Sequence, residues 1–144
     1  MVYGLMKPII IFLAMYGAAA CLSVPENDAI DLTAKAWVVE DINGKEVIER
    51  LQSTISFEKR GKVKGFTGCN NFFGDAKVKS PFITIHLKGI TERACSDVVS
   101  NQERMFIQAL GNVKSYKIKD GLLYLGSASG DAILRFWQRE DIPD

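Results

Sequence analysis

Apolar and polar side chains alternate in short segments over most of the chain between residues 37 and 137. In one such segment Ile83, Ile85 and Leu87 alternate with polar residues. A period of two predicts strands with one buried face, and the pairs Asn-Gly and Asp-Gly at 43–44 and 120–121 predict tight hairpin turns. The pattern predicts seven or eight antiparallel strands, in segments that include 37–39, 54–58, 62–66, 83–88, 116–119, 122–125 and 133–137.

One segment has helical spacing instead. Ser100 and Glu103 form a capping-box pattern, and Gly111 is suited to end a helix. Four apolar residues between them recur at helical intervals: Met105, Phe106, Ala109 and Leu110. This predicts one helix at about 101–110, with an apolar stripe that packs against the sheet. The expected fold class is α+β, with a curved, half-barrel-like antiparallel sheet packed on a single α-helix.

The segment 65–74, with the sequence GFTGCNNFFG, departs from plain alternation. It holds three glycines, two asparagines and three phenylalanines. Gly and Asn tolerate positive φ, so we expect the chain to bend, bulge or cross between sheets here. The favoured interpretation is a structural corner whose aromatic side chains lie in the core. The alternative is a ligand site whose mouth is lined by Phe66, Phe72 and Phe73.

The N-terminal segment differs in kind from the rest. Lys7 is followed by the apolar and small residues of 8–20, which end immediately before Cys21. As a helix, this run would rise only about 20 Å, whereas a bilayer core is about 30 Å thick. A cation, a short apolar run and small residues before a cleavage site are typical of an export signal. Residues 1–20 are therefore predicted to be a signal peptide.

The residues from Ala18 to Cys21 resemble a bacterial lipobox, in which the cysteine is lipidated and becomes the first residue of the mature chain. Ala18 stands where Leu is usual. The alternative is cleavage without lipidation, which would release a soluble protein. The chain has three cysteines, and an odd thiol is a liability in an oxidising compartment. Lipidation of Cys21 leaves Cys69 and Cys95 to form a disulfide; a free or redox-active pair is the alternative.

Residues 21–33 are predicted to be the lipidated cysteine and a polar tether, followed by a domain at about 34–140. Removing the signal peptide removes Lys7, so the remaining Lys and Arg balance the 17 Asp and Glu. A net charge of zero argues against nucleic-acid binding. It also provides no polybasic attachment to a membrane, so the lipid is the only expected anchor.

Candidate catalytic residues are few. The single histidine, His86, falls on the polar face of a predicted strand, where a solvated role is expected. The cysteines and this histidine lack the spacing of a metal site, and no nucleophile or phosphate-loop motif is present. The basic run at 58–64 alternates and is interpreted as the solvated rim of a hairpin. The sequence therefore predicts no catalytic residue, no metal and no cofactor.

Several motifs occur in a specific order along the domain. They are Trp37, Val63-x-Gly65-x-x-Gly68-Cys69-Asn70-x-x-x-Gly74, Thr91-x-x-Ala94-Cys95, Glu103-x-x-Phe106-x-x-Ala109-Leu110, and the segments 116–118, 123–125 and 134–136. In this order they resemble the META domain family of HslJ-like heat-shock lipoproteins. The resemblance covers about residues 35–138. It implies curved antiparallel strands packed on one helix.

The resemblance also implies secreted or lipid-anchored proteins linked to stress tolerance, antibiotic resistance and, in some members, secretion or virulence. It carries no established catalytic residues. The expected function is therefore a non-enzymatic lipoprotein of the bacterial cell envelope, on the outer membrane facing the periplasm where the cell has two membranes. We expect it to support envelope stress tolerance by binding a protein or lipid partner. The residues expected to meet that partner are Phe66, Asn70, Asn71, Phe72 and Phe73.

Two alternatives remain open at this point. One is a lipid- or peptide-binding module of the pilot-protein type, in which the sheet and the helix enclose an acyl chain. An apolar cavity between helix and sheet would favour it. The other is a thiol-dependent enzyme that uses Cys69 and His86.

Overall fold

The computed structural model describes residues 31–33 and 36–139. The predicted signal peptide, Cys21 and most of the predicted tether lie outside these ranges. Within them, no helix is both long enough and apolar enough to cross a membrane. The described residues form nine strands, one α-helix and two short 3-10 helices.

The strands follow the alternating segments of the sequence, with two additions. The elements are β1 (Ala36–Ile42), β2 (Lys45–Glu46), η1 (Glu49–Leu51), β3 (Thr54–Glu58), η2 (Lys59–Gly61), β4 (Lys62–Phe66), β5 (Asn71–Lys79), β6 (Phe82–Ile90), α1 (Asp97–Asn112), β7 (Ser115–Lys119), β8 (Leu122–Gly126) and β9 (Ala132–Arg139). The additions are the two-residue β2 and the long strand β5, which the sequence pattern does not predict.

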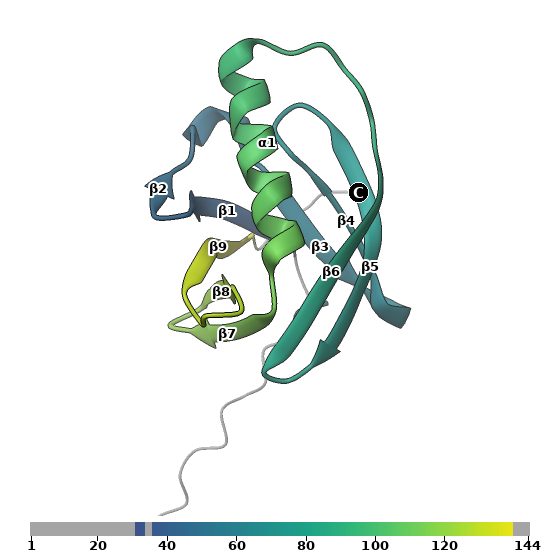
Figure 1. Ribbon diagram of the computed structural model, residues 1–144, viewed down its shortest axis with the longest axis vertical. Coiled ribbons are helices and arrows are strands. Elements are labelled where there is room, and N and C mark those ends of the chain that lie inside the picture. Colours follow the sequence, from purple (N-terminus) through teal and green to yellow (C-terminus); the bar gives the residue numbers. More distant parts are fainter. Residues whose placement is uncertain (1–30, 34–35, 140–144) are drawn as a thin grey trace, which may run out of the picture.

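All strand pairs are antiparallel, and the order of the sheet is β2-β1-β3-β4-β5-β6-β7-β8-β9. Strand β1 also pairs with β9, so the sheet closes into a ring (Figure 1). The two predicted Asn-Gly and Asp-Gly turns are confirmed: Asn43 and Gly44 have φ of 53° and 77°, and Asp120 and Gly121 have the same pair of values. Two consecutive positive φ angles match the right-handed twist of a hairpin. The predicted curved sheet on one helix is therefore confirmed.

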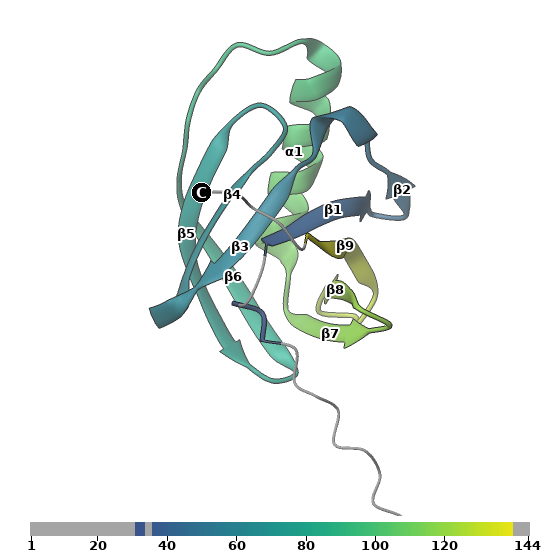
Figure 2. The same ribbon diagram turned by 180° about the vertical axis from the view of Figure 1, so that it is seen from behind.

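The ring is weakest between β6 and β7. These strands pair at a single position, Phe82 with Ser115. The chain between them forms α1, which lies against β6, β1 and β9 (Figures 1 and 2). The buried face of the helix consists of Gln102, Phe106, Ala109 and Leu110. The helix therefore fills the opening that the sparse strand pairing leaves.

The predicted helix boundaries were wrong. The helix starts at Asp97, with Ser96 as its N-cap, so Ser100 and Glu103 do not form a capping box. At the other end Gly111 is helical, nothing lies within 4 Å of where its Cβ would be, and the cap is Val113. Glu103 is instead used in a long-range contact, described below.

The core is organised around Phe106, whose side chain is fully buried. Its ring meets Phe72 of β5 edge-on, with centroids 6.0 Å apart, and lies 6.4 Å from the ring of Phe136 of β9. The helix thereby connects two strands on opposite sides of the opening. On β1, the buried Trp37 donates its indole N–H to the backbone oxygen of Leu32 at 3.2 Å, which attaches residues 31–33 to the ring.

A β-bulge lies at Gly74. Pairing of β5 with β6 shifts register between Phe73 and Gly74. A Cβ on Gly74 would lie 2.2 Å from the backbone oxygen of His86 and 2.9 Å from the Cα of Leu87. Backbone atoms in a paired strand have little room to move away. The close approach of the two strands at this bulge therefore requires glycine.

We predict that Gly74→Ala lowers the free energy of unfolding by about 2–3 kcal/mol, because the methyl group overpacks the bulge. Denaturant titration of the mature chain measures this. The matched control is Gly111→Ala, where nothing lies within 4 Å of the new methyl group. That change should leave stability unchanged or raise it by up to about 1 kcal/mol. Equal effects of the two substitutions would contradict this account of the bulge.

Candidate functional site

The turn between β4 and β5 carries the most distinctive residues of the sequence, and it is buried. The backbone N–H of Thr67 donates to the backbone oxygen of Asn70 at 2.8 Å, and the Asn70 N–H donates to the Thr67 hydroxyl at 2.8 Å. Gly68 between them has a φ of 95°. The Ser53 hydroxyl donates to the backbone oxygen of Thr67 at 2.7 Å. The turn is thus closed on itself and fixed to the chain before β3.

The side-chain amide of Asn70 connects this turn to two other parts of the chain. Its nitrogen donates to both carboxylate oxygens of Glu103 on α1, at 3.0 and 3.1 Å. Its oxygen accepts from the Thr91 hydroxyl at 2.9 Å and from the Arg93 backbone N–H at 2.8 Å. Asn70 is only 4% exposed, whereas Glu103 is half-buried, so these bonds are partly shielded from solvent. One buried amide therefore links the turn, the helix and the segment that follows β6.

Glu103 completes the network from the helix. Its carboxylate accepts from the amide of Asn70 and also from the hydroxyl of Thr67. No buried side-chain nitrogen or oxygen among the residues described lacks a hydrogen-bond partner. Hydrogen bonds to an ionised acceptor are stronger than those between neutral groups, and they are strengthened further away from water. The residues of the motif are therefore occupied in holding the fold together.

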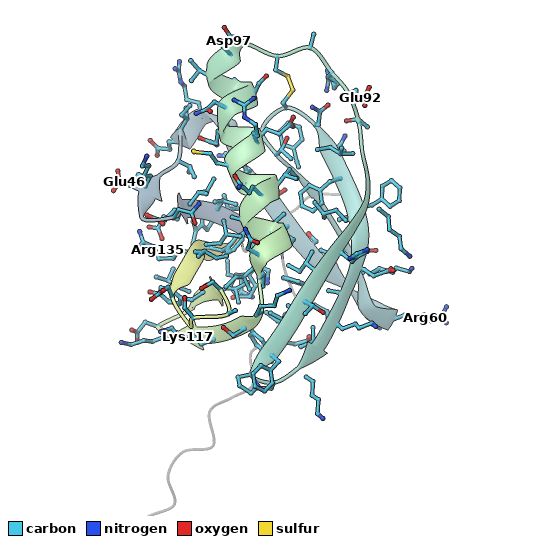
Figure 3. All side chains as sticks on the ribbon, in the orientation of Figure 1. Glu46, Arg60, Glu92, Asp97, Lys117 and Arg135 are labelled. Atoms are coloured by element: carbon cyan, nitrogen blue, oxygen red, sulfur yellow. A yellow bond between two sulfur atoms is a disulfide. The ribbon has the colours of Figure 1, made fainter. Side chains whose placement is uncertain are left out.

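A disulfide joins Cys69 of the same turn to Cys95, just before the helix. The two Cα atoms are 6.3 Å apart and the residues are 26 apart in sequence. Figure 3 shows the bond in yellow between the start of α1 and the β4–β5 turn. Cys69 is buried. The bond fixes the start of the helix to the turn that the Asn70 network also holds.

The structure does not bring His86 together with the cysteines. His86 is exposed, opposite Asp75 on the outer face of β5 and β6. Cys69 faces the buried turn and is bonded to Cys95. In residues 31–33 and 36–139, no group of three or more His, Cys, Asp or Glu side chains is placed to hold a metal ion. The thiol-dependent alternative therefore has no geometric support.

The five residues predicted as a partner surface do not form one. Phe72 lies in the core at 2% exposure, and Asn70 is buried in the network, so the prediction was wrong for both. Phe66 is half-buried. Only Asn71 and Phe73 are exposed. The interpretation of a structural corner with core aromatics holds for Phe72 but not for Phe73.

Phe73 has a local role on the outer face. It is paired with Gly89 of β6, and a Cβ on Gly89 would lie 2.6 Å from the Phe73 ring. The phenyl ring of Phe73 therefore lies over Gly89 and covers backbone that would otherwise be exposed to solvent. An aromatic side chain that covers a glycine on the neighbouring strand stabilises the pairing of the two strands.

Asp75 is held between two lysines on the same face. Lys62 of β4 donates to its carboxylate at 2.8 Å, and Lys88 of β6 contacts the other oxygen. These two hydrogen bonds lower the pKa of Asp75 from 3.8 to about 2. Its negative charge is thus retained well into the acid range. The contacts join three neighbouring strands across the outer surface.

A cavity of about 550 Å³ lies at one end of the ring, away from the Asn70 network. It does not lie between helix and sheet, where Phe106 and Leu110 are fully buried and fill the space. The apolar part of its wall includes Leu32, Phe57 and Val78. Other lining residues are Asp31, Thr33, Glu58, Lys59, Arg60, Gly61, Lys62, Ala76 and Tyr116.

Together these features define a closed antiparallel barrel whose opening is filled by a helix, clamped by a buried amide and a disulfide. The model of the META domain family matches residues 30–140, most of the chain. The chain belongs to the META domain family. The resemblance noted in the sequence is thereby confirmed.

Solved structures share the fold. A crystal structure of a DUF4847 family protein from Bacteroides vulgatus is 15% identical, with a TM-score of 0.59, over 77% of this chain and 96% of that one. An NMR structure of a protein from Burkholderia xenovorans is 18% identical, with a TM-score of 0.60, over 81% and 97%. A second NMR structure is 23% identical, with a TM-score of 0.55, over 73% and 90%. Proteins of curated function give no match. At these identities the likeness shows the fold alone.

We predict that Asn70→Asp lowers the free energy of unfolding by about 3 kcal/mol at neutral pH, because it removes two donors and places a second carboxylate against Glu103. Mutual repulsion raises the folded-state pKa of one carboxyl above its unfolded value. The loss of unfolding free energy relative to the wild type is therefore largest at neutral pH. It becomes smaller as the pH falls and that carboxyl binds a proton. Denaturant titrations of both proteins across this range measure it.

The control is Asn71→Asp, the same chemical change at the adjacent, exposed position. It should alter stability by about 0.5 kcal/mol or less at every pH. A similar loss in both variants would refute the role assigned to the Asn70 amide.

We predict that Cys69→Ser lowers the free energy of unfolding by about 3 kcal/mol, since the disulfide closes a loop of roughly 25 residues in the unfolded chain. Reductant should lower the stability of the wild type to that of the variant and leave the variant unchanged. Thiol titration of the unfolded, unreduced wild type should detect neither Cys69 nor Cys95. If either thiol reacts, the disulfide is not formed in the protein.

Proposed function

We propose that this META domain protein is exported, anchored in the bacterial cell envelope by a lipid on Cys21, and supports stress tolerance there by binding a partner rather than by catalysis. Three observations support this. The N-terminal 20 residues have the pattern of a signal peptide that ends at Cys21. Cys69 and Cys95 lie at bonding distance, and such bonds persist in oxidising compartments. The polar groups of the family motif are used within the fold.

The proposal that the protein is not a catalyst rests on one observation: the polar side chains and cysteines of the family motif are already bonded within the fold. Thr67, Asn70 and Glu103 bond to one another, and Cys69 is bonded to Cys95. Catalytic groups must reach a substrate, whereas these side chains are directed to each other, and Thr67, Cys69 and Asn70 are buried. Activity by contact through the exterior of the barrel is the simplest function that this arrangement supports.

An acyl-binding module of the pilot-protein type has less support. That hypothesis requires an apolar cavity between helix and sheet, and this space is filled by Phe106 and its neighbours. The cavity at the end of the ring is bordered by charged residues, including Lys59 and Arg60. We therefore consider the outside of the domain, rather than its interior, as the binding region.

We predict that Cys21→Ser moves the protein from the membrane fraction to the soluble fraction of the cell envelope. Intact-mass measurement should find the wild type cleaved before Cys21 and heavier by at least one diacylglyceryl group, whereas the variant lacks this addition. The control is Cys69→Ser, which removes a thiol from the domain and should remain membrane-bound. An unmodified Cys21 in the wild type would rule out lipid anchoring.

The stress role is tested in the organism that encodes the protein. Deletion of the gene should increase sensitivity to agents that damage the envelope, and the wild-type gene should restore tolerance. A gene that carries Cys21→Ser should restore less tolerance than the wild-type gene, because the domain is no longer held at the membrane. Full restoration by this variant would show that anchoring is not needed.

A further inference from the structure

Charge is balanced over the mature chain but not over its surface. The β3–β4 turn and the β5–β6 hairpin, which border one end of the ring, form a surface that we call the basic end. Gly61 of the turn packs so close to β5 that a Cβ there would lie 2.8 Å from the backbone oxygen of Ala76. The surface comprises Lys59, Arg60, Lys62, Lys77, Val78, Lys79 and Phe82, with Lys64 and Lys88 beside it and Asp31, Glu58 and Asp75 as its acidic neighbours.

The acidic neighbours are already engaged. Asp75 is held by Lys62 and Lys88, and Glu58 pairs with Lys64 at 2.5 Å. The backbone N–H and hydroxyl of Thr33 lower the pKa of Asp31, which therefore stays ionised, and Lys59 attracts its charge.

Among residues 31–33 and 36–139, the cations that remain have no acidic partner. Within the part of the chain that is described, Arg60, Lys77 and Lys79 make no ion pair. Arg60 projects from the tip of the turn, away from the body of the domain (Figure 3). The basic end thus has an excess of positive charge that an external anion could neutralise.

Apolar side chains accompany these cations. Phe82 is 65% exposed and Val78 is 48% exposed, and Phe82 lies directly opposite Lys79 in the β5–β6 pairing. Together they place two exposed apolar side chains at the same end of the ring as the unpaired cations. Aromatic and aliphatic groups interleaved with lysines are suited to the boundary between lipid headgroups and acyl chains. A small soluble anion would contact the lysines but would gain nothing from the apolar side chains.

The position of the proposed anchor agrees with this. Asp31 and Leu32 line the same cavity as the β3–β4 turn, so the chain enters the ring at the basic end. Asp31 is ten positions after Cys21, so the chain between them can span at most about 36 Å. This step depends on the function proposed above. A lipid on Cys21 would keep the basic end close to the membrane surface.

We propose that the basic end docks on the anionic headgroups of membrane phospholipids, with Phe82 and Val78 entering the interfacial layer. The unpaired Arg60, Lys77 and Lys79 supply the electrostatic attraction. Each such cation strengthens binding to an anionic surface about fivefold. Docking gives the tethered domain a fixed orientation, in which α1 and the opposite end of the ring are turned toward soluble partners.

The test uses the mature chain from residue 21 with Cys21→Ser, so that no lipid contributes. This chain contains the whole described fold and the whole family match. Co-sedimentation is measured with vesicles of phosphatidylcholine and phosphatidylglycerol in equal parts, and with vesicles of phosphatidylcholine alone. We expect binding only to the anionic vesicles, weakening as salt is added. Binding that is absent, or equal for the two vesicle types, overturns the proposal.

The decisive comparison is between two charge reversals of equal size. Lys77→Glu with Lys79→Glu should weaken binding by about thirtyfold or more. Lys45→Glu with Lys119→Glu makes the same change in net charge on β2 and the end of β7, across the ring from β4 and β5 (Figures 1 and 2). This control should weaken binding by about threefold or less at moderate salt. Equal weakening means that only the overall charge matters, which overturns the proposal.

Phe82→Ser tests the apolar part separately. Because the side chain is largely exposed, the thermal midpoint should not change, while affinity for the anionic vesicles should fall roughly tenfold. Unchanged affinity overturns the insertion of Phe82. The vesicle assay and the mass of the mature N-terminus are independent readouts. Loss of vesicle binding with a lipidated Cys21 refutes docking alone, and vesicle binding with an unmodified Cys21 refutes anchoring alone.

Discussion

The structure depends on how the opening between β6 and β7 is filled. These strands pair at one position, and only a short run of main-chain hydrogen bonds, such as that from the Tyr116 N–H to the Pro81 oxygen at 2.9 Å, joins that side of the ring. The helix between them supplies the missing contacts through Phe106, which packs between an aromatic ring on β5 and another on β9. A helix of this length is marginal by itself and gains its stability from such tertiary packing. Ring and helix are therefore stable only together.

The family motif is best understood as a clamp on that helix. The Asn70 amide donates to Glu103 in the first half of α1, and the Cys69–Cys95 disulfide holds the chain just before the helix begins. One is a polar contact partly shielded from water, and the other is a covalent bond that also restricts the unfolded chain. Removing one partner of a buried polar group costs more than the bond contributes, since the remaining group has lost its water. This explains why residues of such polar character lie inside a small barrel.

Sequence patterns predicted the fold where local chemistry decides it and missed what depends on distant contacts. The turns at 43–44 and 120–121 follow from residues that accept positive φ, and they were correct. Strand β5 was missed because Gly74 is required by a neighbouring strand rather than by its own segment. Glu103 was assigned to a local cap, whereas its partner Asn70 is 33 residues away. The net charge of zero did not predict the basic end, because a sum of charges does not show which residues share a surface.

Closure of the ring also restricts how this domain can be recognised. Many β proteins bind partners by adding a strand to an exposed sheet edge, so that main-chain hydrogen bonds provide the affinity. Within residues 36–139, β1 and β9 pair with each other, α1 packs against β6, and the edge strand β2 is two residues long. Unpaired strand backbone is therefore limited to short stretches, such as the part of β3 beyond its two pairs with β1. This favours recognition through side chains, which can diverge between relatives by surface substitution while the barrel is kept.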